Sequence, residues 1–132
     1  MTPDDLARIH ADSFVRARPW GASEFQSLLA DPASFLITCD TGFILGRTML
    51  DEAELLTLAV EPAARRLGTG RNLLTAFEDA ARMRGAATAF LEVACDNQAA
   101  LSLYARAGWQ NAGRRRNYYG GDVDALVMRK HL

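Results

Sequence analysis

Apolar positions are densest in the middle of the chain, where they predict a strand, a turn and a helix. The stretch from Glu54 to Val60 is almost continuously apolar, which is typical of a buried strand, and Pro62 ends it. Gly68 and Gly70 then begin a helix that runs to about Arg84. The positions of that helix that we expect to face a core are Leu73, Leu74, Phe77, Ala80, Ala81 and Met83.

Shorter periodic segments on both sides predict the rest of the fold. Thr2 followed by Pro3 and two aspartates is a strong helix start, and Asp31 before Pro32 is a helix stop. The predicted helices are 2–16, 23–31, 70–84 and 97–107, and the predicted strands are 34–39, 43–50, 54–60, 88–94, 109–116 and 125–130. This order favours an α/β (α+β) fold in which helices cover both faces of a mixed sheet.

Length, charge and cysteine usage narrow the class of protein. The 132 residues are expected to form one domain, residues 1–132, and a net charge of −1 argues against binding nucleic acid or a membrane through the whole surface. Cys39 and Cys95 form no Cys-x-x-Cys pair, the acidic amino terminus does not resemble a signal peptide, and no apolar run approaches the ~20 residues of a membrane span. We therefore expect a cytoplasmic protein with reduced thiols.

The turn before the central helix has the features of an anion site. Glycines allow a ligand to approach the main chain closely, and the first N–H groups of a helix lack partners within the helix. Arg65, Arg66 and Arg71 add positive charge around Gly68 and Gly70. The pattern is also typical of an ordinary tight turn, and it is neither a Walker loop nor the dinucleotide fingerprint. A phosphate or pyrophosphate cradle is therefore a hypothesis at this stage.

Three residues further along are candidates for chemistry, although each has a simpler interpretation. Glu92 interrupts a strand, 90–94, that otherwise has the composition of one buried on both faces, yet it is also typical of a strand-end carboxylate that is paired with an arginine or faces solvent. Asn97 suits a helix N-cap. Tyr104 suits a core aromatic whose hydroxyl reaches the surface.

Taken together, these segments resemble the Gcn5-related N-acetyltransferase (GNAT) family over nearly the whole chain. The motifs that carry the resemblance are Arg65-Arg66-Leu67-Gly68-Thr69-Gly70, Leu91-Glu92-Val93, and the stretch from Asn97 through Ala100, Leu103 and Tyr104 to Gly108-Trp109. Within the family the chain is most similar to bacterial enzymes that acetylate the N-terminal alanine of a ribosomal protein. That similarity is carried by Arg18-Pro19-Trp20, Asp51-Glu52-Ala53-Glu54 and Arg114-Arg115-Arg116-Asn117-Tyr118-Tyr119.

The resemblance implies a cosubstrate, acetyl-CoA, and residues that hold it. Its pyrophosphate would lie on the main chain of Arg65, Arg66, Leu67, Gly68, Thr69, Gly70 and Arg71, which agrees with the anion site. Leu58, Ala59 and Val60 would line the pantetheine arm and polarise the thioester carbonyl, and Asn97 would contact the cosubstrate from the other side. No metal is implied, and His10 and His131 are isolated near the two ends of the chain.

The resemblance also assigns the chemistry. Glu92 matches the general base and Tyr104 the general acid of a direct transfer. An N-terminal ammonium has a pKa near ~8 and must lose a proton before it attacks, so a carboxylate within reach suits the base. A phenol suits the proton donor to the departing thiolate, and no covalent intermediate is needed.

The acceptor would be a protein N-terminus, entering a groove flanked by Trp20, Tyr118 and Tyr119. A lysine or small-molecule amine is an alternative acceptor, and a weakly active CoA-binding partner subunit is an alternative function. The basic run 114–116 also raises RNA binding, although three arginines on an edge strand are more typical of a solvated rim, so we expect no direct nucleic-acid contact.

One feature of the family pattern is missing. Family members usually begin with a strand before the first helix, whereas here Met1 almost adjoins the helix cap. The resemblance therefore implies a GNAT-type, mostly antiparallel sheet that lacks most or all of its first strand. The sheet edge left in this way is either exposed or paired with another chain, which makes weak self-association one alternative.

Overall fold

The fold was analysed in a computed structural model that describes residues 1–13, 20–65, 67–118 and 122–132. The elements are α1 (Pro3–Ser13), α2 (Ala22–Ala30), β1 (Ser34–Cys39), β2 (Gly42–Met49), β3 (Glu52–Val60), the 3-10 turn η1 (Pro62–Ala64), α3 (Thr69–Met83), β4 (Thr88–Ala94), α4 (Gln98–Arg106), β5 (Gln110–Arg115) and β6 (Ala125–His131). The predicted order of helices and strands is confirmed. The predicted end of the first helix, at about Arg16, lies outside the described residues.

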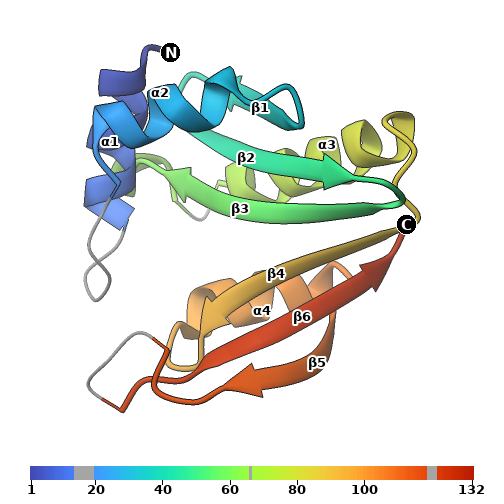
Figure 1. Cartoon of the computed structure of the whole chain (residues 1–132). Coiled ribbons are helices and arrows are strands. Elements are labelled where there is room, and N and C mark those ends of the chain that lie inside the picture. Colours follow the sequence, from blue (N-terminus) through green and yellow to red (C-terminus); the bar gives the residue numbers. More distant parts are fainter. Residues whose placement is uncertain (14–19, 66, 119–121) are drawn as a thin grey trace.

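Six strands form one sheet in the order β1-β2-β3-β4-β6-β5. All neighbouring pairs are antiparallel except β3 and β4, which are parallel and pair only through residues 52–54 and 88–90. Beyond that short ladder the two strands separate, as Figure 1 shows, because β3 continues to Val60 alongside β2 alone. The sheet is mixed and mostly antiparallel, as predicted.

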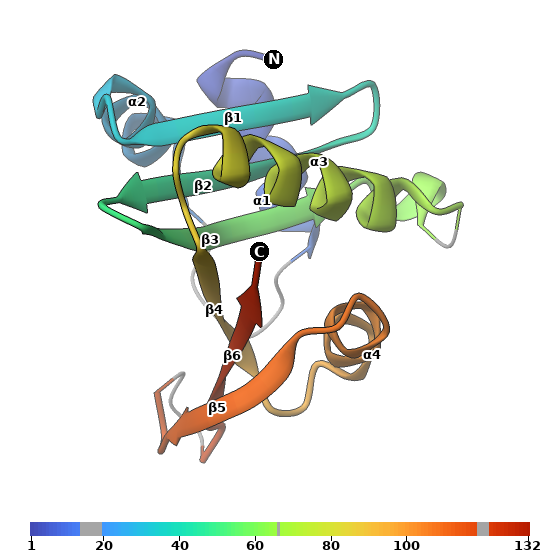
Figure 2. The same cartoon turned by 90° about the vertical axis from the view of Figure 1, so that its right-hand side faces the viewer.

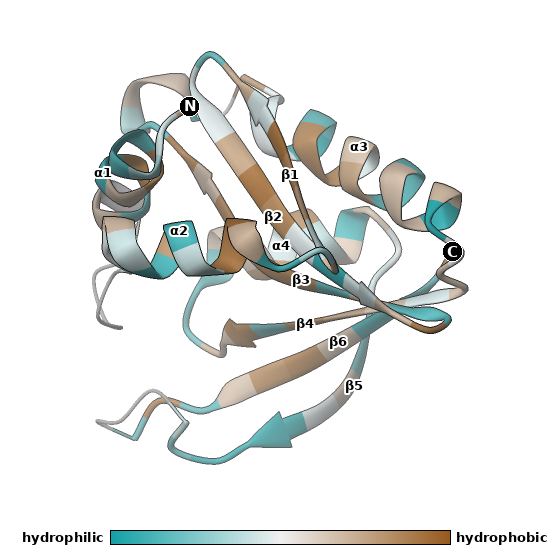
Figure 3. Cartoon of the chain, turned by 45° about the horizontal axis from the view of Figure 1, so that its top comes forward, coloured by the Kyte–Doolittle hydropathy of each residue, from teal (hydrophilic) through white to brown (hydrophobic). Residues whose placement is uncertain are grey.

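Helices cover both faces of the sheet and define two cores. On one face α1 and α2 enclose a cluster that contains Leu6, Phe25 and Phe43. On the other face α3 and α4 pack over a larger cluster that contains Ile44, Phe77 and Met128. Figure 2 shows α3 on the side of β1–β3 opposite α1, and Figure 3 shows apolar residues along β2 and β6 whereas β5 is mainly hydrophilic.

One core prediction for the central helix is wrong. Leu73, Leu74 and Phe77 are buried as expected, but the side chain of Met83 is 90% exposed. Met83 follows Ala81 by two residues, a rotation of about 200° around the helix, so it points away from the stripe that Ala81 occupies. Glu78 occupies the stripe instead, four residues after Leu74 and only 6% exposed.

A buried ion pair accounts for that glutamate. Lys130 on β6 places Nζ 2.5 Å from Glu78 Oε1 and donates a second hydrogen bond to Ala107 O at 2.6 Å. Trp109 donates from its indole Nε1 to Glu78 Oε2 at 3.2 Å. The network therefore connects α3, the end of α4 and β6 at the end of the molecule where β3 and β4 are paired.

The helix starts follow the sequence signals. Thr2 and Asp5 form a reciprocal cap of α1, because Asp5 N donates to Thr2 Oγ1 at 3.2 Å and Thr2 N donates to Asp5 Oδ2 at 2.9 Å.

Among the described residues no strand precedes α1, and β1 is one edge of the sheet. None of the described helices combines the length and apolar character that a membrane crossing requires.

Candidate active site

The turn before α3 has the geometry of a helix N-terminus open to a ligand. Gly68 is the N-cap and has φ +84°, a left-handed conformation that favours glycine. A Cβ atom added at Gly68 would meet no atom within 4 Å, so the space beside it is open. Asn72 N donates to Gly68 O at 3.0 Å, and the N–H groups of the first helical turn, residues 69–71, point toward the N-terminal end of the helix.

Charged and apolar side chains surround this turn. Arg65 is exposed, and its Nε donates to Val60 O at 3.2 Å, so the side chain folds back onto the end of β3. Leu67 is 74% exposed, and Arg71 is exposed on the first turn of α3. Arg66 lies outside the described residues. The predicted cradle is thus an exposed, basic helix start adjacent to the end of the central strand.

The predicted pantetheine strand is the part of β3 that leaves β4. Leu58, Ala59 and Val60 pair with residues 44, 43 and 42 of β2, whereas the β3–β4 ladder ends at Glu54. Ala59 is 2% exposed and its two neighbours are half-buried. In this segment the strand edge opposite β2 is not paired with β4, so its main-chain groups can serve a ligand.

The structure corrects the environment predicted for Glu92. Burial alternates along β4: Leu91 and Val93 are buried, whereas Glu92 is half-buried, with 29% of its side chain exposed. One face of β4 therefore packs on the α3 and α4 core, and Glu92 lies on the other face. The carboxylate is paired, because Arg115 Nη2 lies 3.0 Å from Glu92 Oε1.

Asn97 and Tyr104 have the structural features that their simpler interpretations predict, and these features leave the proposed roles untested. Asn97 caps α4, with Oδ1 accepting a hydrogen bond from Ala100 N at 3.2 Å. Tyr104 is 6% exposed and packs beside Trp109, with ring centroids 6.0 Å apart. Tyr104 belongs to the core on the α3 and α4 side, so it and Glu92 approach from different faces of the sheet.

Trp20 is held by a buried histidine. The rings of Trp20 and His10 stack with centroids 5.0 Å apart, and Trp20 N donates to His10 Nδ1 at 3.1 Å. Burial of His10, which is 3% exposed, lowers its pKa to about 4, although the nearby carboxylate of Glu24 opposes the shift. Phe25 packs edge-on against both rings. The residue predicted to flank the acceptor groove thus has a fixed backbone and ring plane.

Asp124 holds together the described residues at the two ends of the connection between β5 and β6. Its carboxylate accepts hydrogen bonds from Asn117 N at 2.7 Å and from Arg114 Nη1 at 2.8 Å. The Asn117 N–H and then the Arg114 side chain lower the pKa of Asp124. Asn117 Oδ1 in turn accepts a hydrogen bond from Asp122 N at 2.9 Å. Tyr118, in this turn, is 52% exposed, and Tyr119 lies outside the described residues.

Sequence reasoning missed four residues that shape this region. Arg115 was treated as part of a solvated rim, Asp124 was not singled out, and His10 was noted only as a histidine isolated from any cluster of metal ligands. The buried Thr57 Oγ1, which has no hydrogen-bond partner among the described residues, lies one position before Leu58. A polar residue within the apolar run of the central strand was the available signal for Thr57.

No cluster of His, Cys, Asp and Glu in the described parts of the chain could hold a metal ion.

Comparisons with known proteins agree with this arrangement. Over 96% of this chain and 90% of the relative, it is 37% identical to the [ribosomal protein bS18]-alanine N-acetyltransferase of Escherichia coli. It is also 37% identical to the N-alpha-acetyltransferase RimI of Mycobacterium tuberculosis, over 94% of this chain and 83% of that protein.

Solved structures show the same fold. The crystal structure of the ribosomal-protein-S18-alanine N-acetyltransferase from Escherichia coli matches with a TM-score of 0.84 and 34% identity, covering 95% of this chain and 84% of that one. Ard1 from Thermoplasma volcanium matches with a TM-score of 0.87 and 26% identity, covering 100% and 94%. A model of the acetyltransferase (GNAT) family matches residues 4–109, which include the turn before α3, Glu92 and Tyr104. This chain therefore belongs to the acetyltransferase (GNAT) family, as the sequence resemblance predicted.

Proposed function

We propose that this protein transfers the acetyl group of acetyl-CoA to the α-amino group of an N-terminal alanine on a ribosomal protein. The observation that carries the proposal is the 37% identity to the Escherichia coli bS18-alanine N-acetyltransferase across nearly the whole chain. The acetyltransferase family match supports acetyl-CoA as the acetyl donor. The choice of acceptor rests on the relatives' names, and so it is the first part to test.

The residues present fit acetyl-CoA. The open space beside Gly68 and the N–H groups at the start of α3 suit the pyrophosphate, and Arg71 adds positive charge there. The β3 edge at Leu58, Ala59 and Val60 suits the pantetheine amides and the thioester carbonyl. Acetyl-CoA supplies an activated acyl group with a thiolate leaving group. Asn97, at the start of α4, would contact it from the opposite side.

Glu92 and Tyr104 would supply the proton transfers. Glu92 accepts a proton from the acceptor's ammonium, directly or through one water, and the free amine then attacks the thioester carbonyl carbon. A C–N bond forms and the C–S bond breaks, the phenol of Tyr104 gives its proton to the departing sulfur, and the second proton that the attacking nitrogen loses on becoming an amide restores the phenol through solvent. The two residues lie on different faces of the sheet, so substrates must bridge them where β3 and β4 have separated.

The test uses purified protein, acetyl-CoA and peptides analysed by mass spectrometry. A peptide with the N-terminal sequence of bS18 should gain one acetyl group at its α-amine, whereas the same peptide with a blocked N-terminus and free lysines should not. Glu92→Gln and Tyr104→Phe should each lower kcat by about 10²- to 10⁴-fold with little change in acetyl-CoA affinity. Acetylation of lysines or free amines instead would refute the acceptor, and unchanged kcat in both variants would refute the two roles.

A further inference from the structure

Arg115 contacts two residues that have different roles in the proposed reaction, Glu92 and Tyr118. Its Nη2 lies 3.0 Å from Glu92 Oε1, and its guanidinium carbon lies 5.3 Å from the centroid of the Tyr118 ring. The first contact reaches the proposed general base, and the second reaches the turn where we expect the acceptor to enter. A single side chain therefore links the base to the acceptor turn.

The sheet register explains how an arginine on β5 reaches a carboxylate on β4. The strand β6 lies between them, and Glu92, Val127 and Gly113 form one row across the three strands. Arg115 is two residues beyond Gly113, so its side chain projects from the same face as Glu92. Arg115 lies opposite Ala125 on β6, whose side chain is only a methyl group, so the guanidinium can cross β6 toward Glu92.

The neighbouring Arg114 provides a natural comparison. It carries the same charge and has a similar exposure, 53% against 58% for Arg115. Successive residues of a strand point to opposite faces, and Arg114 pairs with Asp124 instead of Glu92. Asp124 keeps its hydrogen bond from Asn117 N if the Arg114 side chain is removed. The two arginines thus differ in the partner they hold.

We propose that Arg115 is a positioning residue that fixes the Glu92 carboxylate through Oε1, leaving Oε2 for the acceptor amine, and couples this orientation to the Tyr118 turn. The inference rests on the proposed role of Glu92 as general base. An ion pair restricts rotation of the carboxylate, so the base is oriented before the acceptor arrives. The same guanidinium lies over the ring of Tyr118, so a peptide that binds at this turn and moves Tyr118 would also move Arg115, which holds the Glu92 carboxylate.

The first experiment compares Arg115→Gln with Arg114→Gln in steady-state kinetics with the acceptor peptide. Arg115→Gln should lower kcat by about ten- to a hundredfold, a loss typical of a misplaced catalytic group, and leave the KM for acetyl-CoA unchanged. Arg115→Lys should recover part of the loss because it keeps a cation near Glu92. Arg114→Gln leaves the Glu92 pair in place and should lower kcat far less than Arg115→Gln does. Equal losses in the two glutamine variants would overturn the inference.

A double-mutant cycle with Glu92→Gln separates positioning from a general structural effect. If Arg115 acts through the carboxylate, Arg115→Gln should add no further loss of kcat once Glu92 is already glutamine. The same loss in both backgrounds, or a rise in kcat when Arg115 is replaced, would refute the positioning role. If Glu92→Gln itself leaves kcat unchanged, the proposed base is wrong; a normal loss there with no effect of Arg115→Gln refutes this inference alone.

Discussion

Replacing Glu78 with leucine should strongly destabilise the fold, because it leaves a partly buried cation without its carboxylate partner. Glu78 accepts from Lys130 Nζ and from Trp109 Nε1, and only 8% of its side chain is exposed. Removing one partner of a buried ion pair typically costs about 3–5 kcal/mol. Lys130 has 22% of its side chain exposed and keeps its bond to Ala107 O, so we expect the lower end of that range, about 3 kcal/mol.

The cost should be visible in thermal and urea unfolding. With an unfolding entropy of about 2.1 cal/mol/K per residue, 132 residues give roughly 280 cal/mol/K, so a loss of about 3 kcal/mol lowers Tm by about 11 °C. Urea titrations followed by circular dichroism should show a lower midpoint with the same m value.

The matched control removes both charges. Glu78→Leu combined with Lys130→Met replaces the ion pair with apolar side chains of similar size, and such replacements are often neutral or stabilising. The Trp109 N–H and Ala107 O lose their partners in this variant, so we expect a residual cost of about 1–2 kcal/mol. A double variant less stable than Glu78→Leu, or a single variant within about 1 kcal/mol of the parent, would refute the reasoning about an uncompensated charge.

Three further perturbations test other parts of the structure. Burial lowers the pKa of His10 to about 4, so between pH 4 and about 6.5 the unfolded chain binds a proton that the folded chain does not. The free energy of unfolding should therefore fall as the pH drops through this range. His10→Phe should reduce the change in Tm between pH 7 and pH 5. Gly46→Ala should cost about 1–3 kcal/mol in urea titrations, because the new Cβ would lie 2.5 Å from Phe77 Cε2. Gly68→Ala should raise the KM for acetyl-CoA severalfold, whereas Gly85→Ala, with φ +94° at the other end of α3, should cost similar stability and leave that KM unchanged.

The order of elements was predictable because its signals are local. Thr2 and Asp5 form the expected cap, and β4 has the predicted bounds, Thr88–Ala94. The errors arise where tertiary packing decides. Glu92 lies on the half-exposed face of a strand whose composition indicated burial on both sides, since α3 and α4 cover only the other face. The position of Met83 depended on which side of the helix meets the sheet.

The contacts within the site were less predictable than the residues. The resemblance supplied Glu92 and Tyr104, and the spacing of Gly68 and Gly70 predicted the open helix start. The ion pair between Glu92 and Arg115 depends on β6 lying between β4 and β5, so two residues 23 positions apart in the sequence meet across a third strand that comes later in the chain. No local sequence pattern predicts that Glu92 and Arg115 come into contact.

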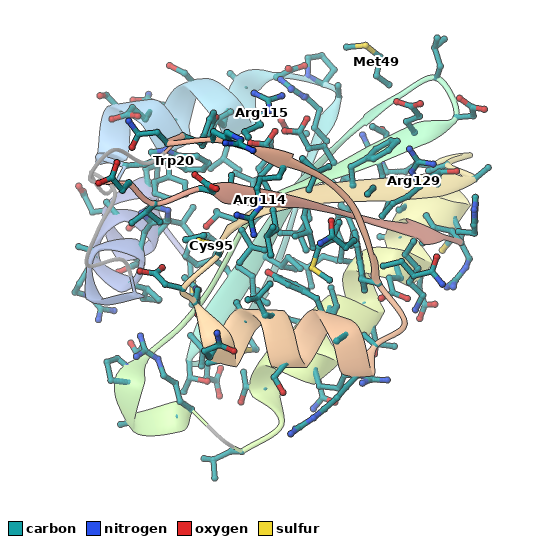
Figure 4. All side chains as sticks on the ribbon, turned by 90° about the horizontal axis from the view of Figure 1, so that it is seen from below. Trp20, Met49, Cys95, Arg114, Arg115 and Arg129 are labelled. Carbon is teal, nitrogen blue, oxygen red and sulfur yellow. The ribbon has the colours of Figure 1, made fainter. Side chains whose placement is uncertain are left out.

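The sheet separates stability from the proposed chemistry along β4. Lys130, which holds Glu78, pairs in register with Ala89 near the end where β3 and β4 are joined, whereas Glu92 pairs with Val127 three residues further along, about 10 Å away. Figure 4 shows Arg114 and Arg115 on β5, whose pairing with β6 runs from Gln110 beside Arg129 to Arg115 beside Ala125. The Glu78 network therefore lies beyond contact with Glu92, although its Trp109 packs against Tyr104. Glu78→Leu should lower Tm far more than it lowers kcat measured well below the transition, and Arg115→Gln should do the reverse because an exposed pair contributes only about 0–1 kcal/mol.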